Sequence, residues 1–145
     1  MKEKAVIFDI DDTLSDTDHR QQLAETKQWS AFYASLKDDK PMATIDILKA
    51  LYNTGYKIIL VTGRPEIYKE DTVTWLCNHF VPYHELHMRP VAKQYVKDAA
   101  VKLKIYEREI HPKYDVIAVF EDRRQCVDMW RKIGLLCFQP KESNF

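Results

Sequence analysis

Three carboxylates lie close together near the start of the chain, in the run Asp9-Ile-Asp-Asp-Thr-Leu14. This run directly follows the apolar residues 5–8, which are typical of a short buried strand. A strand that ends there would deliver Asp9 and Asp11 into one opening, where carboxylates can bind a metal, attack an electrophile or transfer a proton. The sequence therefore predicts chemistry at the end of the first strand.

Polar side chains also follow the later apolar runs. Thr62-Gly63-Arg64 comes after a strand predicted over residues 57–62, and Glu121-Asp122 comes after one predicted over residues 116–120. Lys102 lies in the helical segment before that last strand, four residues past Asp98, for which we predict a helix N-cap. Ligands of parallel α/β sheets bind beyond the carboxyl ends of the strands, so we expect these groups to meet Asp9 and Asp11.

The residue types in this group point to phosphate chemistry. Several carboxylates that converge without cysteine or histidine suit a hard cation that prefers oxygen ligands, most naturally Mg²⁺. A lysine, a threonine and arginines around the same spot suit a phosphate, whose charge the metal and the cations would share. A free carboxylate beside them can attack phosphorus in line and form an aspartyl phosphate that water then hydrolyses.

Alternating patterns along the chain predict the elements that position these groups. Apolar runs indicate strands over residues 5–8, 57–62, 85–88, 116–120 and 135–138. The residues between them are apolar at helical spacing, in four stripes: Ile45, Leu48, Leu51 and Tyr52; Val73, Leu76, Cys77 and Phe80; Val96, Ala100, Leu103 and Tyr106; Val127, Trp130 and Ile133. This alternation predicts an α/β fold, a three-layer, Rossmann-like and mainly parallel sheet of about five strands with helices on both faces.

The 145 residues are expected to form a single domain over residues 1–145. Gly55 and Gly134 follow helical segments and are predicted to be left-handed caps, whereas Gly63 would let the backbone approach a ligand. Residues 15–42 are too long for a simple strand-to-helix connection, so we predict a flap and an extra helix near the opening. Its aromatic residues, Trp29, Phe32 and Tyr33, favour a small packed helix over a base-stacking platform, although a position at the opening would allow both.

Composition limits the class of protein. The chain has 22 basic and 22 acidic residues, which argues against broad binding to long nucleic acid but leaves a local basic pocket open. Its three cysteines lack a CxxC spacing, and its five histidines lack a zinc spacing. With a charged start that leaves no room for a signal peptide and no apolar run of membrane-spanning length, we expect a soluble, cytoplasmic protein with reduced cysteines.

The ordered set Asp9-x-Asp11-x-Thr13, Thr62, Lys102 and Glu121-Asp122 resembles the four motifs of the haloacid dehalogenase (HAD) phosphatase superfamily. A narrower resemblance is to the 3′-phosphatase domain of phage polynucleotide kinase/phosphatase. It rests on Arg20, Thr62-Gly-Arg64, the residues 97–102 and the long segment 121–134. No GxxxxGK[ST] motif of the kinase half occurs in this sequence, so the resemblance implies phosphatase activity without kinase activity.

The resemblance implies a role for each matching residue. Asp9 would be the nucleophile and a Mg²⁺ ligand, while Asp11 would protonate the leaving oxygen, activate water and bind the metal through its backbone carbonyl. Asp122 and Glu121 would complete the metal site. The phosphate and the substrate would be held by a further set: Thr62, Gly63, Arg64, Arg20 and Lys102. No large cap domain is expected.

Two positions depart from the pattern of the resemblance. Asp12 stands where many relatives have glycine, which alters the charge and flexibility of the loop, and neither nucleophilic attack nor proton transfer is expected of it. Glu121 stands where the closest resemblance has aspartate, and its extra methylene can push the carboxylate out of direct contact with the metal.

The expected function is a Mg²⁺-dependent phosphomonoesterase whose substrate is a 3′-phosphate at a DNA or RNA end. One alternative is a phosphatase for free nucleotides or another small phosphoester, with residues 15–42 as a small lid, and the neutral net charge favours it. Another alternative is a catalytically silent module that binds phosphate or nucleic-acid ends. The sequence leaves the oligomeric state open.

Overall fold

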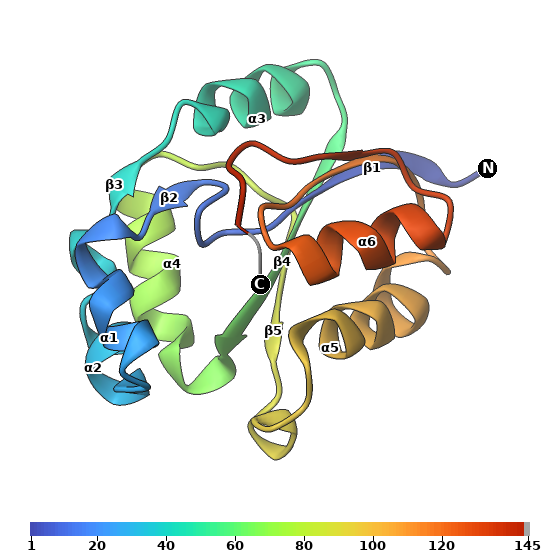
Figure 1. Cartoon of the computed structure of the whole chain (residues 1–145). Helices are drawn as coiled ribbons and strands as arrows, with labels where there is room; N and C mark the ends of the chain where they lie inside the picture. The colour runs from blue at the N-terminus through green and yellow to red at the C-terminus, as the bar shows by residue number, and fades with distance from the viewer. Residues whose placement is uncertain (144–145) are drawn as a thin grey trace.

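A computed structural model describes residues 1–143 of the chain. Its centre is a five-stranded sheet with the spatial order β5-β4-β1-β6-β7, in which every neighbouring pair is parallel (Figure 1). The strands are β1 (Glu3–Phe8), β4 (Lys57–Pro65), β5 (Glu85–Arg89), β6 (Tyr114–Phe120) and β7 (Cys137–Phe138). This confirms the predicted α/β fold with about five strands.

The first strand lies in the middle of the sheet, which explains its continuous apolar run. β1 pairs with β4 on one side, where Phe8 lies opposite Leu60, and with β6 on the other, where Phe8 lies opposite Phe120. All residues from Ala5 to Phe8 are buried, because helices cover both faces of the sheet. The carboxyl end of β1 therefore lies between the ends of β4 and β6.

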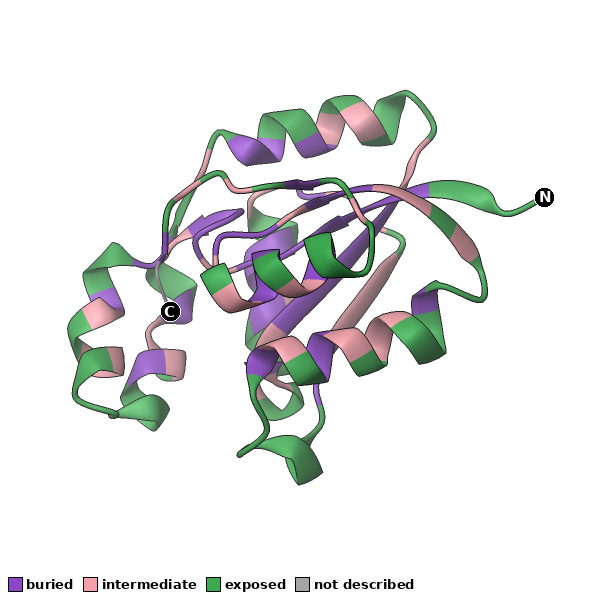
Figure 2. Ribbon diagram, turned by 45° about the vertical axis from the view of Figure 1, so that its right-hand side comes forward, coloured by how far each residue is buried: buried purple, intermediate pink, exposed green. Residues whose placement is uncertain are grey.

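Two pairs of helices form the outer layers (Figure 1). Val6 and Phe8 face a core with Leu48 of α3 (Thr44–Asn53) and Leu76 of α4 (Lys69–Asn78). The other face of the sheet packs on α5 (Asp98–Ile105) and α6 (Arg124–Lys132), with Trp130 among the buried residues. Figure 2 shows the result, buried strands between helices whose outer sides are exposed.

Each of the four predicted apolar stripes includes an exposed residue, and two of the stripes depart further from the pattern. In α4 the buried aromatic residue is Trp75, whereas Phe80 lies beyond the end of the helix and is 80% exposed. In the third stripe Val96 and Ala100 are exposed, and α5 instead buries Asp98, Val101 and Lys102. In α5 the reason is chemical: Lys102 is buried against the carboxylates described below, and Asp98 is buried against cations that include Lys102.

The strand β4 is longer than predicted. It runs to Pro65, which lies opposite Arg89 of β5 after a register shift that begins at Val61. Thr62, Gly63 and Arg64 therefore lie within the irregular end of a strand and not after it. Pro65 is extended and precedes a short 3₁₀ turn, so it does not open a helix directly.

Residues 15–42 form an excursion beside the sheet, seen at the left of Figure 1. Its two ends pair as a small antiparallel sheet of β2 (Ser15–Asp16) and β3 (Lys40–Pro41). The excursion contains two helices, and not one as predicted: α1 (Gln21–Glu25) and α2 (Trp29–Ala34), with 3₁₀ turns η1 (Asp18–Arg20) and η2 (Leu36–Asp38). Its role as a flap stays a prediction, as does the division into a single domain.

Short turns complete the fold. They are η3 (Glu66–Tyr68) and η4 (Val91–Lys93), both 3₁₀, and η5 (Tyr106–Ile110), a π-helical turn that continues α5. Gly55 and Gly134 have φ angles of +103° and +95°, as predicted for left-handed caps. Within residues 1–143 there is no large cap domain. None of the helices there is long and apolar enough to cross a membrane.

Candidate active site

Three carboxylates from two neighbouring strands meet at the end of the sheet. Asp9 follows β1, while Glu121 and Asp122 follow β6, and ligand oxygens from all three lie within 4.8 Å of one another. Each of the three side chains is buried. The predicted acidic group is therefore brought together in space.

Lys102 of α5 supplies positive charge to this carboxylate cluster. Its Nζ donates to Asp9 Oδ1 at 2.9 Å and to Glu121 Oε1 at 2.8 Å. Burial opposes the charged form of Lys102, but the charges of Asp9 and other nearby carboxylates outweigh burial and raise its pKa well above the ordinary value. Lys102 is therefore a fixed cation beside Asp9.

The cluster carries more negative charge than the protein balances. Burial, and then the charge of Asp9, raise the pKa values of Glu121 and Asp122 above their ordinary range. A divalent cation would supply the missing positive charge, and the donors are all oxygens, as Mg²⁺ prefers. Asp9, Glu121 and Asp122 thus fit a Mg²⁺ site. Glu121 also accepts hydrogen bonds from Lys102 and from Trp130 Nε1 (3.3 Å), so these two groups orient it.

Asp98 holds Lys102 in position from one turn earlier in α5. The prediction that Asp98 caps the helix is wrong, because Lys97 occupies the N-cap position and Asp98 is the first residue of α5. The Asp98 carboxylate is buried, lies 3.5 Å from Lys102 Nζ and accepts a hydrogen bond from Arg89 Nη2 at 3.2 Å. The i, i+4 spacing of Asp98 and Lys102 is a signal for this ion pair that our interpretation of Asp98 as a cap did not use.

Gly63 lies in close contact with the start of α5, and its predicted contact with a ligand stays a prediction. A Cβ atom at this position would lie 2.2 Å from Asp98 Oδ1, which is far inside van der Waals contact. The missing side chain therefore lets β4 approach the Asp98 carboxylate. Arg89 Nε also donates to the Gly63 carbonyl at 3.0 Å, which joins β4 to β5 at the same point.

A second charged group surrounds Asp11. Arg20 Nη2 donates to Asp11 Oδ1 at 2.6 Å, and Arg64 Nη2 donates to the same oxygen at 2.7 Å. Both arginine side chains are completely buried, whereas the Asp11 side chain is 26% exposed. The structure thus brings Arg20 and Arg64 to Asp11. Their predicted contact with substrate stays a prediction.

The charge of Asp11 follows from these pairs. Burial alone would raise its pKa, but the charges of Arg64 and Arg20, and the hydrogen bonds that they donate, outweigh burial and hold the pKa well below its usual range. Asp11 is therefore an ionised carboxylate and, while both arginines donate to it, a poor acceptor of a proton. To donate one, it must first lose part of this stabilisation.

Asp39 is a member of this group that the sequence did not reveal. Its buried carboxylate accepts from Arg20 Nε at 2.8 Å and from Arg20 Nη2 at 2.7 Å, and lies 3.5 Å from Arg64 Nη2. Trp75 Nε1 of α4 donates to the Asp39 carbonyl at 2.9 Å, which anchors the end of the excursion to the core. A lone aspartate in an unpatterned segment carries no signal of this role.

Asp12 makes structural contacts, and its expected absence from attack and proton transfer stays a prediction. Its φ is +60°, a left-handed conformation that glycine adopts most easily and aspartate tolerates. Its carboxylate accepts from Thr17 Oγ1 at 2.7 Å and from Lys141 Nζ at 3.0 Å. Asp12 therefore links the start of the excursion to the C-terminal segment.

Thr62 is buried in the irregular end of β4. Its hydroxyl oxygen accepts a hydrogen bond from the backbone N–H of Arg64 at 3.1 Å, which stabilises the irregular end of β4. Its predicted contact with phosphate stays a prediction.

A cavity of about 670 Å³ opens over both groups. Asp9, Asp11, Gly63, Glu121 and Asp122 contribute to its floor and walls, together with residues of the excursion and of the β5–α5 loop. Its volume falls within the usual range for small-molecule sites. This cavity is therefore the candidate active site.

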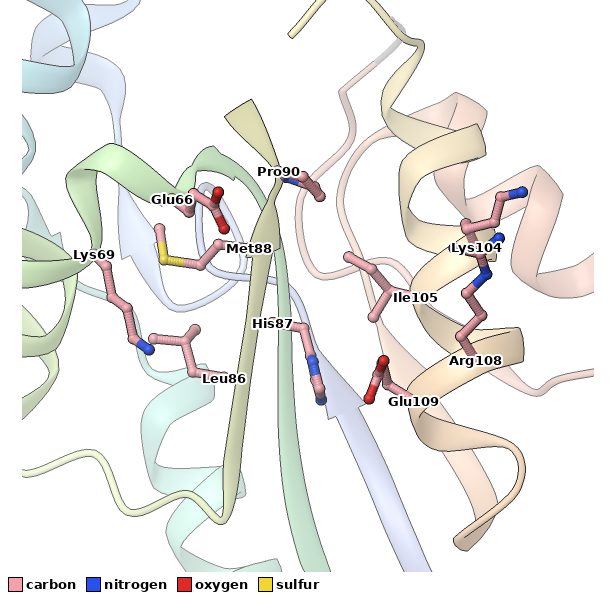
Figure 3. Close-up of a pocket in the computed structure, with 10 residues that line it drawn as sticks. All are labelled: Glu66, Lys69, Leu86, His87, Met88, Pro90, Lys104, Ile105, Arg108 and Glu109. Atoms are coloured by element: carbon pink, nitrogen blue, oxygen red, sulfur yellow. The ribbon is translucent and has the colours of Figure 1, made fainter. Parts of the chain in front are cut away.

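A smaller pocket of about 330 Å³ lies beside the edge strand β5 (Figure 3). Leu86 and Met88 point to one side of the strand and His87 to the other, toward Glu109. Its lining includes none of the carboxylates or arginines of the two groups. We assign the chemistry to the larger cavity, where those groups converge.

Comparison with known proteins identifies related chains. The family described as the polynucleotide kinase PNKP phosphatase domain matches residues 3–145. A putative bifunctional polynucleotide kinase/RNA ligase of Autographa californica nuclear polyhedrosis virus is 32% identical over 135 residues, which cover 91% of this chain and 18% of that protein.

Solved structures agree with this match. A chain in the structure of the Pnkp1/Rnl/Hen1 RNA repair complex has a TM-score of 0.88 and 34% identity over 99% of this chain and 44% of that chain. The class C acid phosphatase from Bacillus anthracis has a TM-score of 0.67 over 86% of this chain and 53% of that chain, at 17% identity, and therefore shares the fold. The chain spans less than half the length of the viral relative and of the repair-complex chain.

The contact between Gly63 and Asp98 predicts the effect of Gly63→Ala. The new methyl group would displace Asp98 and, through it, Lys102, so we expect phosphomonoester hydrolysis to fall by roughly 100-fold. Gly134→Ala is the matched control, since a Cβ there meets open space and its positive φ costs only about 1–2 kcal/mol of stability. Phosphate release and urea unfolding, measured on both variants, would separate the effects. Equal activity of the two variants would contradict the role of Gly63.

Proposed function

The chain belongs to the family of polynucleotide kinase PNKP phosphatase domains, a group of HAD phosphatases, and from this premise we propose that it removes 3′-phosphates from polynucleotide ends. The proposed reaction is hydrolysis of a phosphomonoester through an aspartyl phosphate on Asp9, with Mg²⁺ as cofactor. The observation that carries this proposal is the environment of the Asp9 carboxylate. It is buried, borders the cavity and lies beside two further carboxylates, and its Oδ1 is 2.9 Å from Lys102 Nζ.

Asp9 and Asp11 divide the proposed reaction between them. A carboxylate oxygen of Asp9 attacks phosphorus, the bond from phosphorus to the 3′-oxygen breaks, and that oxygen takes a proton from Asp11. Water then attacks the phosphorus of the aspartyl phosphate and gives a proton to Asp11, while the bond from phosphorus to the Asp9 oxygen breaks. Phosphate leaves, and both side chains return to their starting state. Bound Mg²⁺, held by Asp9, Asp122 and Glu121 and by the backbone carbonyl of Asp11, would supply electrostatic stabilisation of the phosphoryl oxygens.

The arginine pair offers a way to protonate Asp11 at the right time. Arg20 and Arg64 keep Asp11 ionised while they donate to its carboxylate. A substrate phosphate would compete for the same guanidinium groups, and each hydrogen bond that moves to the phosphate raises the pKa of Asp11. Thr62 and the Gly63 backbone, together with Lys102, would hold the transferring phosphoryl group.

Three features support a polynucleotide end as the substrate. The matched family is named for polynucleotide kinase, the viral relative carries a polynucleotide kinase name, and residues 1–143 contain no large cap that would enclose a small molecule. The alternative is a nucleotidase or other small-molecule phosphatase, which the neutral net charge and the excursion over residues 15–42 favour. A silent binding module is disfavoured, because Asp9 and Asp11 line the cavity and Lys102 donates to Asp9.

The relatives and the cysteines support a proposal for the process and the compartment in which the protein acts. By analogy with the repair-complex chain, we propose that the protein takes part in nucleic-acid repair. Its cysteines, Cys77, Cys126 and Cys137, are free thiols, which suits a reducing cytoplasm.

Replacement of the nucleophile is the most direct test of the mechanism. In Asp9→Asn the amide has nearly the same shape but is a poor nucleophile, so we expect turnover to fall by at least about 10⁴-fold without loss of the fold. Asp128→Asn on the exposed side of α6 is the matched control and should retain full activity. Phosphate release and circular dichroism measure the two properties, and substantial activity of Asp9→Asn would reject the aspartyl-phosphate route.

Substrate preference separates the proposed function from its alternative. We expect the wild-type protein to release phosphate faster from a 3′-phosphorylated oligonucleotide than from 3′-mononucleotides at equal concentration, because the open cavity admits a polymer end. An oligonucleotide with a 5′-phosphate is the matched control. A large preference for mononucleotides would favour the nucleotidase instead.

The uncompensated carboxylates predict that Mg²⁺ stabilises the protein. A cation that binds only the folded state raises the melting temperature as its concentration rises. At 100 times its dissociation constant it adds about 2.7 kcal/mol to the free energy of unfolding. We expect this shift for the wild-type protein and a much smaller one for Asp122→Asn, whose amide is a weaker ligand. Calorimetric scans with and without Mg²⁺ measure it, and an unchanged shift in Asp122→Asn would exclude Asp122 as a ligand.

A further inference from the structure

The candidate active site is much larger than a phosphate group requires. The carboxylates line it, and one of them, Asp9, accepts a hydrogen bond from Lys102. Aromatic and aliphatic side chains from the excursion, from residues 65–68 and from residues 91–96 line it as well. The exposed aromatic residues among them are Trp29 of α2, which is 50% exposed, and Tyr95 of the β5–α5 loop, which is 93% exposed. Neither contributes to the two hydrophobic cores that hold the sheet to its helices.

Trp29 is held by other rings although half of its surface is open. It contacts Phe32 edge to face, with 5.6 Å between ring centroids, and Tyr33 in a stacked arrangement at 6.4 Å. Tyr33 stacks in turn on Tyr68 at 4.8 Å, which ties α2 to the turn before α4. Trp29 is therefore a fixed aromatic surface at the opening, and the aromatic group of the excursion both packs and borders the cavity.

Tyr95 lies on a projecting loop with a rigid base. Residues 91–97 are all exposed and form the finger at the bottom of Figure 1. Arg89 closes its base, since Arg89 Nη1 donates to the carbonyls of Lys93 at 2.9 Å and Val96 at 2.5 Å. The same guanidinium reaches Asp98, which positions Lys102. The finger is thus anchored to the catalytic end of the sheet while Tyr95 itself stays open to solvent.

We propose that Trp29 and Tyr95 form a subsite that stacks the nucleobases of a single-stranded 3′-phosphate end. This subsite rests on the proposed function, since the phosphate at Asp9 fixes where the bases must lie. Stacking on exposed rings is tolerant of sequence, because every base has a π-face. Lys93 and Lys97 of the finger are exposed beside Tyr95, which suits the charged backbone of a polynucleotide. A lid over a small phosphoester would not need a lysine-bearing finger.

The test compares substrates that differ only in their bases. Trp29→Ala and Tyr95→Ala are each expected to lower kcat/KM for a 3′-phosphorylated single-stranded oligonucleotide by about 10-fold. Both variants should keep the wild-type rate with glycerol 2-phosphate and with an oligonucleotide whose last two nucleosides are abasic. Trp29→Phe and Tyr95→Phe keep a ring and should recover most of the loss. Phe80→Ala is the control, because Phe80 is an exposed aromatic residue outside the cavity lining.

A binding measurement makes the result independent of turnover. In the Asp9→Asn background, the dissociation constant for the same oligonucleotide, measured by fluorescence anisotropy, should rise by a similar factor in each alanine variant. Equal losses with base-bearing and abasic substrates, or no loss with either, would overturn the subsite. A wild-type protein without activity on any phosphomonoester would instead reject the proposed function. Tyr95 makes no core contact, so its variant keeps the test decisive even if Trp29→Ala unfolds α2.

Discussion

The site depends on one buried cation, Lys102, among carboxylates from three different elements. Its ammonium group joins Asp9 after β1 to Glu121 after β6, and Asp98 holds it from within its own helix. Breaking a buried ion pair by removing one partner typically costs 3–5 kcal/mol, because the remaining charge is left uncompensated. The parallel order of the sheet, the phase of α5 and the missing side chain at Gly63 all serve this arrangement. The interaction that sets up the chemistry thus also fixes how α5 lies against the sheet.

The second constraint is the pairing of Asp11 with two arginines, which connects the excursion to the sheet. Arg20 comes from the excursion and Arg64 from β4, and Asp39 contacts both. The Arg20 guanidinium lies over the ring of Phe32, with 4.2 Å between Arg20 Cζ and the ring centroid. This face-on contact adds to the burial of the cation. Residues 15–42 are therefore an integral part of the site. The charge of Asp11 is set jointly by an element of the core fold and by an element inserted into it.

Much of the fold was predictable because strand and helix signals are local. The buried runs 5–8 and 116–120 and the polar residues that follow them indicated the sheet and its active edge, and the motif residues predicted the carboxylate cluster. The phase of α5 was not predictable from apolar spacing, since Asp98 and Lys102 are buried through ion pairs that an apolar pattern cannot register. The role of Arg89 at the base of the finger rests on hydrogen bonds to backbone carbonyls, which leave no pattern in the sequence. Asp39 depends on contacts between segments distant in sequence. The irregular end of β4 depends in the same way on pairing with β5.

The open edge of strand β5 affects how readily the protein aggregates at high concentration. Within residues 1–143, β5 pairs with β4 on one side and has no strand partner on the other. An open edge of this kind is a template for a strand from another molecule. Here the charged side chains of Lys69, Lys104 and Arg108 border the strand, in the pocket drawn in Figure 3. An approaching strand would have to strip water from these charges, so the border of β5 protects the sheet against edge-to-edge aggregation.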